Sequence, residues 1–368
     1  MNYSYWEIKE WFKNIDYTIV GSGIVGLNCA IKLKEKHPKA TVLILEKGML
    51  PQGASTKNAG FACFGSLSEI IDDLKNHTEQ EVYSLVKKRW KGLELLRTNL
   101  GDKNIDFQQN KGFELCNSEL FFEECISRKN DINKLLEPIF KDDVFSISEN
   151  KFNFNKVHPK YIVNKFEGQI DTGKMMSELL FKAQKLGVKI LNNIEVQNYV
   201  ESGNSTHIKT NELEFKTKKL FIATNGFASK LIKENVQPAR AQVLITKPIK
   251  SLNIKGTFHL DKGYYYFRNI DDRILFGGGR NLDFKTEETT KFGLTGVIQD
   301  KLESILTETI LPNTSFEIEH KWSGIMGVGN QKKAIVKRVS ENVFCGVRLG
   351  GMGIAIGSLV GRDLAELI

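Results

Sequence analysis

The sequence predicts an α/β protein in which a Rossmann-like dinucleotide-binding domain, assembled from separated segments, is joined to a second, mixed α+β domain with an antiparallel sheet. Three observations predict it. A strand, a glycine turn and a helix follow one another near the N-terminus, and glycine- and alanine-rich segments recur in the middle and at the end. The 368 residues also exceed the roughly 250–300 residues at which a single hydrophobic core stops growing.

The composition is typical of a soluble protein, with 41% apolar and 26% charged residues. The net charge of +8 is spread along the chain, which favours contact with anions, and we do not expect a nucleic-acid partner. The five cysteines show no CxxC pair and no metal-like spacing, so they indicate a reducing cytoplasm and no metal site. Because no signal peptide and no apolar segment of about 18–20 residues is found, we expect a cytoplasmic protein without a membrane span.

Residues 17–45 predict a βαβ unit. The apolar residues 17–20 predict a strand, and apolar residues spaced like one helix face follow from Ile24 until His37, which precedes a proline. The branched apolar run 41–45 predicts a buried parallel strand.

The turn of this unit, GSGIVG, is a GxGxxG fingerprint. Gly21 allows a tight turn, Gly23 lets the backbone approach a pyrophosphate, and Gly26 lets the helix pack on the strand. Glu46 ends the next strand, where a carboxylate can accept both ribose hydroxyls, and an acid there argues against NADP. The expected binding residues of the unit are Gly21, Gly23, Ile24, Val25, Gly26, Glu46 and Lys47.

Shorter signals predict the elements that follow this unit. Thr78 and Glu81 have capping-box spacing and begin a long helix. Another helix ends near Gly187, and a strand follows at once. Two short strands, 207–210 and 212–215, are expected to precede a separate apolar strand in KLFIATNG.

The second domain is predicted mainly from alternation. Residues 243–279 are mostly β, and Tyr264, Tyr266 and Arg268 share one face of a strand. We expect the dinucleotide-binding domain to comprise residues 1–75, 151–230 and 325–368, and the second, substrate-binding domain to comprise residues 76–150 and 231–324.

Five pieces of the sequence, in order, resemble the D-amino-acid-oxidase-like family of FAD-dependent oxidoreductases, which includes glycine oxidase, sarcosine oxidase and bacterial amine and amino-acid dehydrogenases. The pieces are SYWE, IVGSGIVGLNCA with LEKG, GASTKNAGF, IATNGFAS, and YYYFRNIDDRILFGGGR with GGMGIAIGSLVGRDLAEL. The resemblance covers nearly the whole chain. It implies a GR2-type FAD-binding domain and non-covalent FAD, because Met326 stands near the place of the flavin-linking cysteine of sarcosine oxidase.

The loop QGASTKNAGFACFG is poor in bulk and follows the ribose-binding acid. In the family this loop runs along the flavin, where a planar ring leaves little room, and a flexible linker is the alternative interpretation. The resemblance implies three sets of contacts: Ala54, Ser55 and Thr56 at the pyrophosphate and ribityl chain, Lys57 at a phosphate or the polar ring edge, and Asn58, Ala59 and Gly60 beside N5.

Three further segments resemble cofactor contacts of the family. The backbone of Val196 would read the adenine, and Ala223, Thr224 and Gly226 would close beneath the dinucleotide. The last segment would pass the flavin pyrimidine and start a helix whose N-terminus stabilises the negative charge of the reduced flavin. Its implied residues are Arg348, Gly350, Gly351, Met352, Gly353, Ile354 and Ala355.

The resemblance implies hydride transfer from the carbon of a small amine or amino acid to flavin N5, which leaves an imine that hydrolyses. Oxygen or a quinone would reoxidise the flavin. Tyr264 matches a substrate-binding tyrosine of the family, whereas Met326 and Gly351 replace the two arginines of glycine oxidase.

Candidates for an acidic substrate group are then Arg268, Arg348 and Arg240, with Tyr264 and Tyr266 beside Arg268. The alternative for Arg268 is a structural role against the following DDR, and His259 is interpreted as a satisfied strand histidine.

Two other functions stay open. One family member removes a carboxymethyl group from a wobble uridine of tRNA, but the sequence has no basic stripe interleaved with aromatic residues. The other is a non-catalytic FAD-binding subunit.

Overall fold

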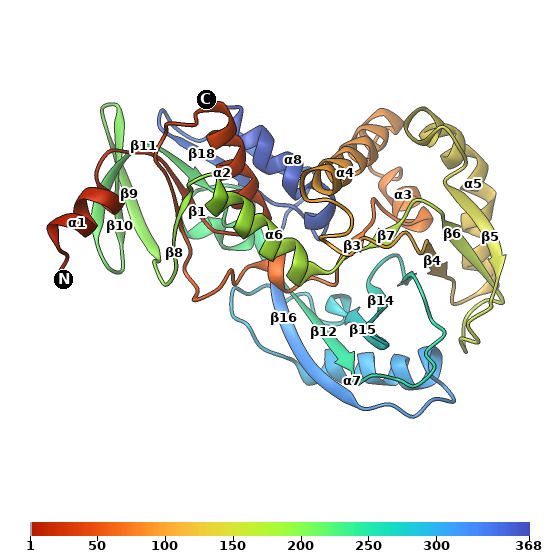
Figure 1. Ribbon diagram of the computed structural model, residues 1–368. Coiled ribbons are helices and arrows are strands. Elements are labelled where there is room, and N and C mark those ends of the chain that lie inside the picture. Colours follow the sequence, from red (N-terminus) through yellow and green to blue (C-terminus); the bar gives the residue numbers. More distant parts are fainter. Residues whose placement is uncertain (1) are drawn as a thin grey trace.

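The computed structural model describes residues 2–368, which form two large sheets and the helices packed on them. The molecule is elongated (Figure 1). The hairpin of β9 (Val196–Ser202) and β10 (Ser205–Thr210) lies at one end, and α5 (Glu119–Phe140) lies at the other. Among the described residues, no helix is both long and apolar enough to cross a membrane.

The first sheet contains the predicted βαβ unit, and five of its strands run parallel. Two of these strands are buried along their whole length and the other three in part, because helices cover one face, and the β9–β10 hairpin and residues 228–236 contribute to a second apolar cluster on the other. The covering helices are α2 (Ile24–Lys36), α6 (Thr172–Lys185) and α8 (Gly353–Ala365). The strands, in sheet order, are β17 (Ile335–Arg338), β18 (Val343–Val347), β11 (Glu214–Ile222), β1 (Ile15–Val20), β2 (Val42–Leu45) and β8 (Lys189–Leu191).

The glycine turn between β1 and α2 has the predicted geometry. Gly21 has a φ of +102°, which favours glycine. A Cβ on Gly26 would lie 1.9 Å from the carbonyl oxygen of Gly21, so only glycine lets α2 approach the turn this closely. The prediction of a βαβ unit is therefore confirmed.

One strand prediction was wrong. Residues 212–215 and the apolar run after them were expected to be separate strands, but β11 is continuous from Glu214 to Ile222. Its first half alternates between buried and exposed residues because only one face is covered where it pairs with β10. Its second half is buried between β1 and β18. The change of pattern reflects a change of neighbours within one strand, with no turn between.

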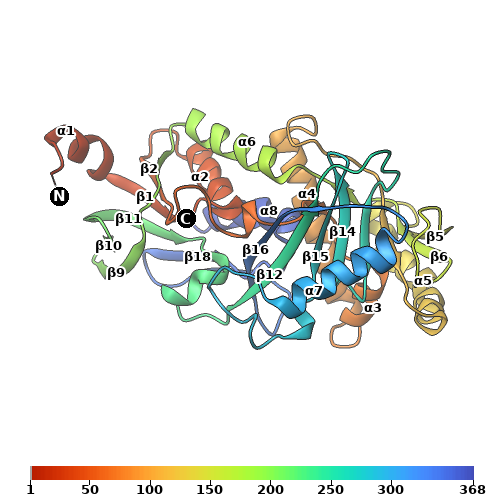
Figure 2. The ribbon, with the colours of Figure 1, turned by 90° about the horizontal axis from the view of Figure 1, so that it is seen from below.

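The second sheet has eight strands, and all its neighbours are antiparallel except β4 and β13. Helix α7 (Gly296–Ile305) crosses one face of it (Figure 2). Phenylalanines from several strands stack beneath this helix, with the rings of Phe258 and Phe267 4.5 Å apart. The strands, in sheet order, are β16 (Ile318–Val328), β12 (Gln237–Thr246), β15 (Arg273–Gly278), β14 (Tyr265–Ile270), β13 (Thr257–Leu260), β4 (Gly112–Leu115), β6 (Lys160–Asn164) and β5 (Phe145–Glu149).

Two elements differ from the expected domain boundaries. Strand β6 belongs to the second sheet, although residues 151–230 were expected in the first domain. Helix α4 (Glu79–Leu100) begins at the predicted capping box, yet it packs on α8, where a Cβ on Gly92 would lie 2.0 Å from a backbone oxygen. The other short elements are α1 (Tyr5–Glu7), β3 (Phe61–Ala62), α3 (Leu67–Asp73) and β7 (Gly168–Gln169).

Candidate active site

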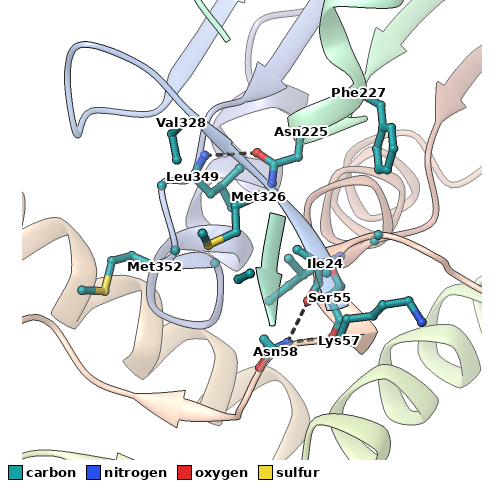
Figure 3. Close-up of a pocket in the computed structure, with 18 of the residues that line it drawn as sticks. Ile24, Ser55, Lys57, Asn58, Asn225, Phe227, Met326, Val328, Leu349 and Met352 are labelled. Carbon is teal, nitrogen blue, oxygen red and sulfur yellow. Dashed lines mark hydrogen bonds between the residues drawn. The ribbon is translucent and has the colours of Figure 1, made fainter. Parts of the chain in front are cut away.

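A cavity of about 1040 Å³ lies between the carboxyl ends of β1, β2 and β11 and the inner face of the second sheet. In parallel α/β sheets, ligands bind at these strand ends. Figure 3 shows the loop after β2, the turn after β11, strand β16 and the start of α8 converging on the cavity.

Most of the predicted site residues line this cavity, and a few do not. Those lining it are Gly21, Gly23, Ile24, Val25, Glu46, Lys47, Ala54, Ser55, Lys57, Asn58, Ala59, Gly60, Val196, Ala223, Thr224, Tyr264, Tyr266, Gly350, Gly351, Met352, Gly353 and Ile354. Those outside its lining are Gly26, Thr56, Gly226, Ala355, Arg268 and Arg348.

The N-terminus of α2 faces the cavity without a side-chain cap of its own. Gly23 is the N-cap, and the Oγ atom of Ser55 accepts from the amide of Ile24 at 2.9 Å. A Cβ on Gly23 would lie 2.9 Å from that same Oγ atom. The loop after β2 is therefore fitted to the helix end, where N–H groups and the helix dipole favour an anion.

The carboxylate of Glu46 is held in a fixed orientation. Its Oε2 atom accepts from the backbone N–H of Ser22 at 3.0 Å and from the Ser22 hydroxyl at 2.7 Å. Its Oε1 atom accepts from the N–H of Gly48 at 3.0 Å. Oε2 thus accepts two bonds and Oε1 one, which leaves about one of the roughly four acceptor sites, at Oε1, for a hydroxyl group such as one of a ribose in the cavity that Glu46 lines.

The loop after β2 is ordered by Asn58, so the alternative of a flexible linker was wrong. The Nδ2 atom of Asn58 donates to the carbonyls of Ala54 and Ser55 at 3.1 and 3.0 Å. Its Oδ1 atom accepts from the N–H of Gly60 at 2.8 Å and from the hydroxyl of Thr172 at 3.0 Å. These four bonds give the loop one shape against the cavity, and Figure 3 shows Asn58 beside Ser55 and Lys57 of the loop.

Arg268 supports this loop from the side away from the cavity, which corrects the expectation that it faces the substrate. Its Nε atom donates to the carbonyl of Ala59 at 2.5 Å and an Nη atom donates to Ile170 at 2.9 Å. Arg268 is 3% exposed, and burial lowers its pKa to about 10. A structural role was the alternative expectation, but its partners are these two carbonyls: within residues 2–368 no hydrogen bond or ion pair joins Arg268 to the DDR turn, whose Asp271 acts on it only electrostatically.

The other two arginine candidates are also bound by protein groups. Arg348 has a φ of +64° and donates to the carbonyls of Lys333 and Asn235. Arg240 forms a bidentate pair with Glu287, at 2.8 Å for each bond. The sequence offered both only as nearby arginines and carried no information about these protein partners.

The start of α8 closes the other end of the cavity. Gly350 and Gly351 have φ values of +60° and +82°, and the N-cap Met352 provides no side-chain hydrogen bond. The N–H of Leu349 donates to Oδ1 of Asn225 at 3.2 Å, which joins this segment to the turn after β11 (Figure 3). The first amides of α8 are thus presented to the cavity with the positive end of the helix dipole.

Strands β13 and β14 of the second sheet and the short strand β3 together form an aromatic wall. The ring of Phe61 lies edge-on to Tyr266 and to His259, with centroid distances of 5.6 and 5.3 Å. Burial raises the pKa of Tyr266 to about 12, so its phenol stays neutral. His259 is satisfied, as expected, by a bond to Glu167, but its ring also lines the cavity.

Several lining residues were not identified from the sequence. Asn225 could have been found, because an Asn-Gly pair after a strand indicates a turn in which the asparagine can adopt a positive φ. Its φ in the structure is +44°. Arg280 follows a glycine run, which is a weak signal. Phe292 comes from an irregular segment without periodicity. Gly226 was assigned to the cavity but packs on β16, where its Cβ would lie 2.4 Å from the carbonyl oxygen of Met326.

The donor set fits FAD. A helix N-terminus fits the pyrophosphate, the oriented Glu46 fits a ribose, and a loop of small residues leaves room for a planar ring. Cβ positions on Gly53 and Gly350 meet no protein atom within 4 Å, which leaves space for a ligand. The buried hydroxyl of Thr224 lines the cavity and has no protein partner. Within residues 2–368, no cluster of potential metal ligands is found.

Comparisons with known proteins agree with this fit. The model of the family DAO, described as FAD dependent oxidoreductase, matches residues 16–367. The probable oxidoreductase OrdL of Haemophilus influenzae is 21% identical over 386 residues, which cover 97% of this chain and 83% of OrdL. Glycine oxidase from Geobacillus kaustophilus has a TM-score of 0.77 at 18% identity, covering 96% of this chain and 94% of its own. L-proline dehydrogenase from P. horikoshii has a TM-score of 0.74 at 20% identity, covering 96% and 93%. Because the family model covers nearly the whole chain, this protein belongs to the DAO family and is an FAD-dependent oxidoreductase.

Proposed function

We propose that the protein oxidises the C–N bond of a small amine or amino acid. The observation that carries this proposal is the continuity of one cavity, which runs from the glycine fingerprint to the aromatic wall of the second sheet. Glycine oxidase, L-proline dehydrogenase and iminodiacetate oxidase, which share the fold, are named for amino acids or a related amine. Their names support the substrate class.

The residues that would hold FAD are those already described around the three parts of the cofactor. Gly21, Gly23 and the amides of Ile24 and Val25 would bind the pyrophosphate, and Glu46 would bind the ribose of the adenosine. The loop from Ala54 to Gly60 and the start of α8 would bind the ribityl chain and the ring. When bound, FAD supplies the acceptor for a hydride from the substrate carbon.

The substrate would occupy the part of the cavity beside Phe61, Tyr264 and Tyr266. With FAD and substrate bound, Phe61 and Tyr266 would limit water in this part and favour the neutral amine over the ammonium ion, because burial disfavours a charge. The imine that results from oxidation would hydrolyse to a carbonyl compound and to ammonia or a smaller amine. No protein nucleophile is needed for this reaction.

The cofactor is proposed to be non-covalent. Met326 lines the cavity and cannot form a flavin thioether through a thiolate. Cys63 also lines it, but burial raises the pKa of its thiol well above the ordinary value, which makes it a poor nucleophile. All five cysteines are free and buried, in agreement with the proposed cytoplasmic location. Oxygen or a quinone is proposed as the electron acceptor.

A nucleic-acid substrate is not favoured by the charges around the cavity. Four lysines that line it are paired with acids. Lys47 and Lys230 lie 2.8 and 3.6 Å from Glu195, and Lys262 and Lys332 lie 3.9 and 2.5 Å from Asp72 and Asp73. These four basic side chains are locally compensated, which weakens any open track for phosphates.

The function is tested by turnover with an artificial dye as electron acceptor. Amino acids, N-methyl amino acids and polyamines are supplied in turn, and the carbonyl product and the released amine are quantified. We expect one class to give equimolar carbonyl product and ammonia or smaller amine. Replacement of the dye by oxygen or by a soluble quinone then identifies the acceptor. A protein that retains FAD but turns over none of these compounds would contradict the proposal.

A further inference from the structure

Arg280 lines the cavity and has no side-chain partner among the described residues. Its side chain is only partly exposed, yet none of its nitrogen atoms makes a hydrogen bond or an ion pair with residues 2–368. The buried arginines of the same range, by contrast, all donate to protein oxygens. These are Arg89, Arg240, Arg268 and Arg348.

The position of Arg280 is determined by its neighbours. It follows Gly279, whose φ of +77° turns the chain at the end of β15. Its guanidinium lies over the ring of Phe284 at 4.7 Å, and the ring of Tyr264 lies 6.1 Å from the same phenylalanine. Stacking uses one face of the planar guanidinium and leaves its edge N–H groups available.

The nearest carboxylates do not neutralise it. Both oxygens of Glu287 are bound by Arg240 at 2.8 Å. Glu288 is exposed, and the carboxylate of Asp283 accepts from the N–H of Thr286. Burial lowers the pKa of Arg280, and the opposing influence of Tyr264, Glu287 and Glu288 is smaller.

Other cations of the cavity are less suited to hold a planar anion. Lys47, Lys230, Lys262 and Lys332 are paired with acids, as described above. The ammonium of Lys57 lies over the ring of Phe292 at 5.5 Å, and an ammonium is a point charge on a flexible stem. Only a guanidinium offers two parallel N–H groups at the spacing of the two carboxylate oxygens.

We propose that Arg280 binds the carboxylate of the substrate, beside Tyr264, and that the substrate is therefore an amino acid and not a simple amine. This inference rests on the proposed function, which it makes more specific. The phenol of Tyr264 has no hydrogen-bond partner among the described residues and lines the cavity next to Arg280. It can therefore donate to the same carboxylate, whose two oxygens together accept up to about four hydrogen bonds.

The test compares carboxylate ligands with their neutral amides on the purified holoprotein. Acetate, benzoate, acetamide and benzamide are titrated, and the change in flavin absorbance gives each Kd. Arg280→Gln is expected to weaken acetate and benzoate at least about tenfold, because it removes charge-assisted hydrogen bonds, and to change the amides less than about twofold. Arg280→Lys is expected to give an intermediate loss, since it keeps the charge and loses the fork.

Arg128→Gln is the matched control. Arg128 lies on the surface, 3.7 Å from Asp131, so its replacement makes the same charge change away from the cavity. It should leave all four Kd values within about twofold, because exposed pairs contribute little. Retention of FAD by the Arg280 variants is expected, since no buried protein group loses a partner.

Three results would overturn the inference. In the first, acetate and benzoate do not change the flavin absorbance of the unmodified protein. In the second, their Kd values are unchanged in Arg280→Gln. In the third, Arg280→Gln weakens carboxylates and amides equally, which would indicate a packing role. Failure of the proposed function is distinguishable, because it would appear as a flavin that no amine or amino acid reduces while the carboxylate selectivity of Arg280 persists.

Discussion

The Nε2 atom of His259, whose ring lines the cavity, lies 2.6 Å from the Oε1 atom of Glu167, and both side chains are buried. The hydroxyl of Thr257 donates to the same oxygen at 2.7 Å. Burial alone would lower the pKa of His259, but the carboxylates of Glu167, Glu69 and Glu114 outweigh it and raise the pKa to about 9. The ring is therefore an imidazolium at neutral pH, and this buried ion pair joins β13 to the loop before β7.

This pair predicts a pH dependence of stability. The folded-state pKa of His259 is raised above its ordinary value of 6.5, so the stabilisation is fully present below pH 6.5 and is lost as the pH rises through about 9. A shift of this size corresponds to about 3 kcal/mol. The free energy of unfolding in urea is therefore measured for the unmodified protein and for His259→Gln. The stability advantage of the unmodified protein should be about 3 kcal/mol smaller at pH 9.5 than at pH 6. Parallel pH profiles would show that the imidazolium does not contribute.

A buried water molecule is predicted beside the same pair. The Oε2 atom of Glu167 and the Nδ2 atom of Asn164 have no protein partner, and both residues line a small cavity of about 10 Å³ next to Glu114. A polar cavity of roughly 10–15 Å³ holds one water molecule. A crystal structure at high resolution should show one ordered water bonded to these two atoms. Empty electron density there, with both atoms unpaired, would contradict the prediction.

Arg268 is predicted to control FAD affinity through the loop that it supports. In Arg268→Gln the carbonyls of Ala59 and Ile170 lose their donors, which costs on the order of 2–4 kcal/mol because both are buried. We expect apoprotein of this variant to bind added FAD at least about tenfold more weakly in a fluorescence titration, since the loop loses its fixed shape. Arg273→Gln is the control, because Arg273 pairs with Glu319 at the surface. Equal FAD affinities in the two variants would show that the loop is ordered without Arg268.

Gly26 is predicted to tolerate no side chain. In Gly26→Ala the new Cβ would lie 1.9 Å from the carbonyl oxygen of Gly21, so α2 must move away from β1. We expect a loss of several kcal/mol in the free energy of unfolding of the apoprotein, measured in urea, as for other overpacked sites. Gly53→Ala is the control. Its Cβ would meet no protein atom within 4 Å, and a stability change below about 0.5 kcal/mol is expected. Similar losses in both variants would contradict the role assigned to the turn.

The sequence predicted those features that depend on local geometry. The glycine turn, the helix cap at Thr78 and the burial of β2 follow from backbone sterics, hydrogen bonds between near neighbours and the apolar pattern of a parallel strand. The course of β11 was misread because its polar residues reflect exposure on one face and not a break in the strand.

The substrate side was predicted less well for a physical reason. Alternation indicates which face of a strand a side chain occupies, but contacts between distant segments decide whether it meets solvent, ligand or backbone. Arg268 donates to the carbonyl of Ala59, which lies 209 positions away in the chain. Arg280 remains without a partner because Glu287, only seven positions further on, is bound by Arg240. Neither relationship leaves a periodic signal in the sequence.

The central claim is that FAD in this cavity oxidises an amino acid. It is tested most directly by mixing the holoprotein anaerobically with a panel of amino acids, N-methyl amino acids and simple amines while the flavin absorbance is recorded. The account predicts loss of the oxidised flavin band with at least one amino acid, and little or no loss with the amine that lacks its carboxylate. Purification without FAD, or a bound flavin that none of these compounds reduces, would contradict it.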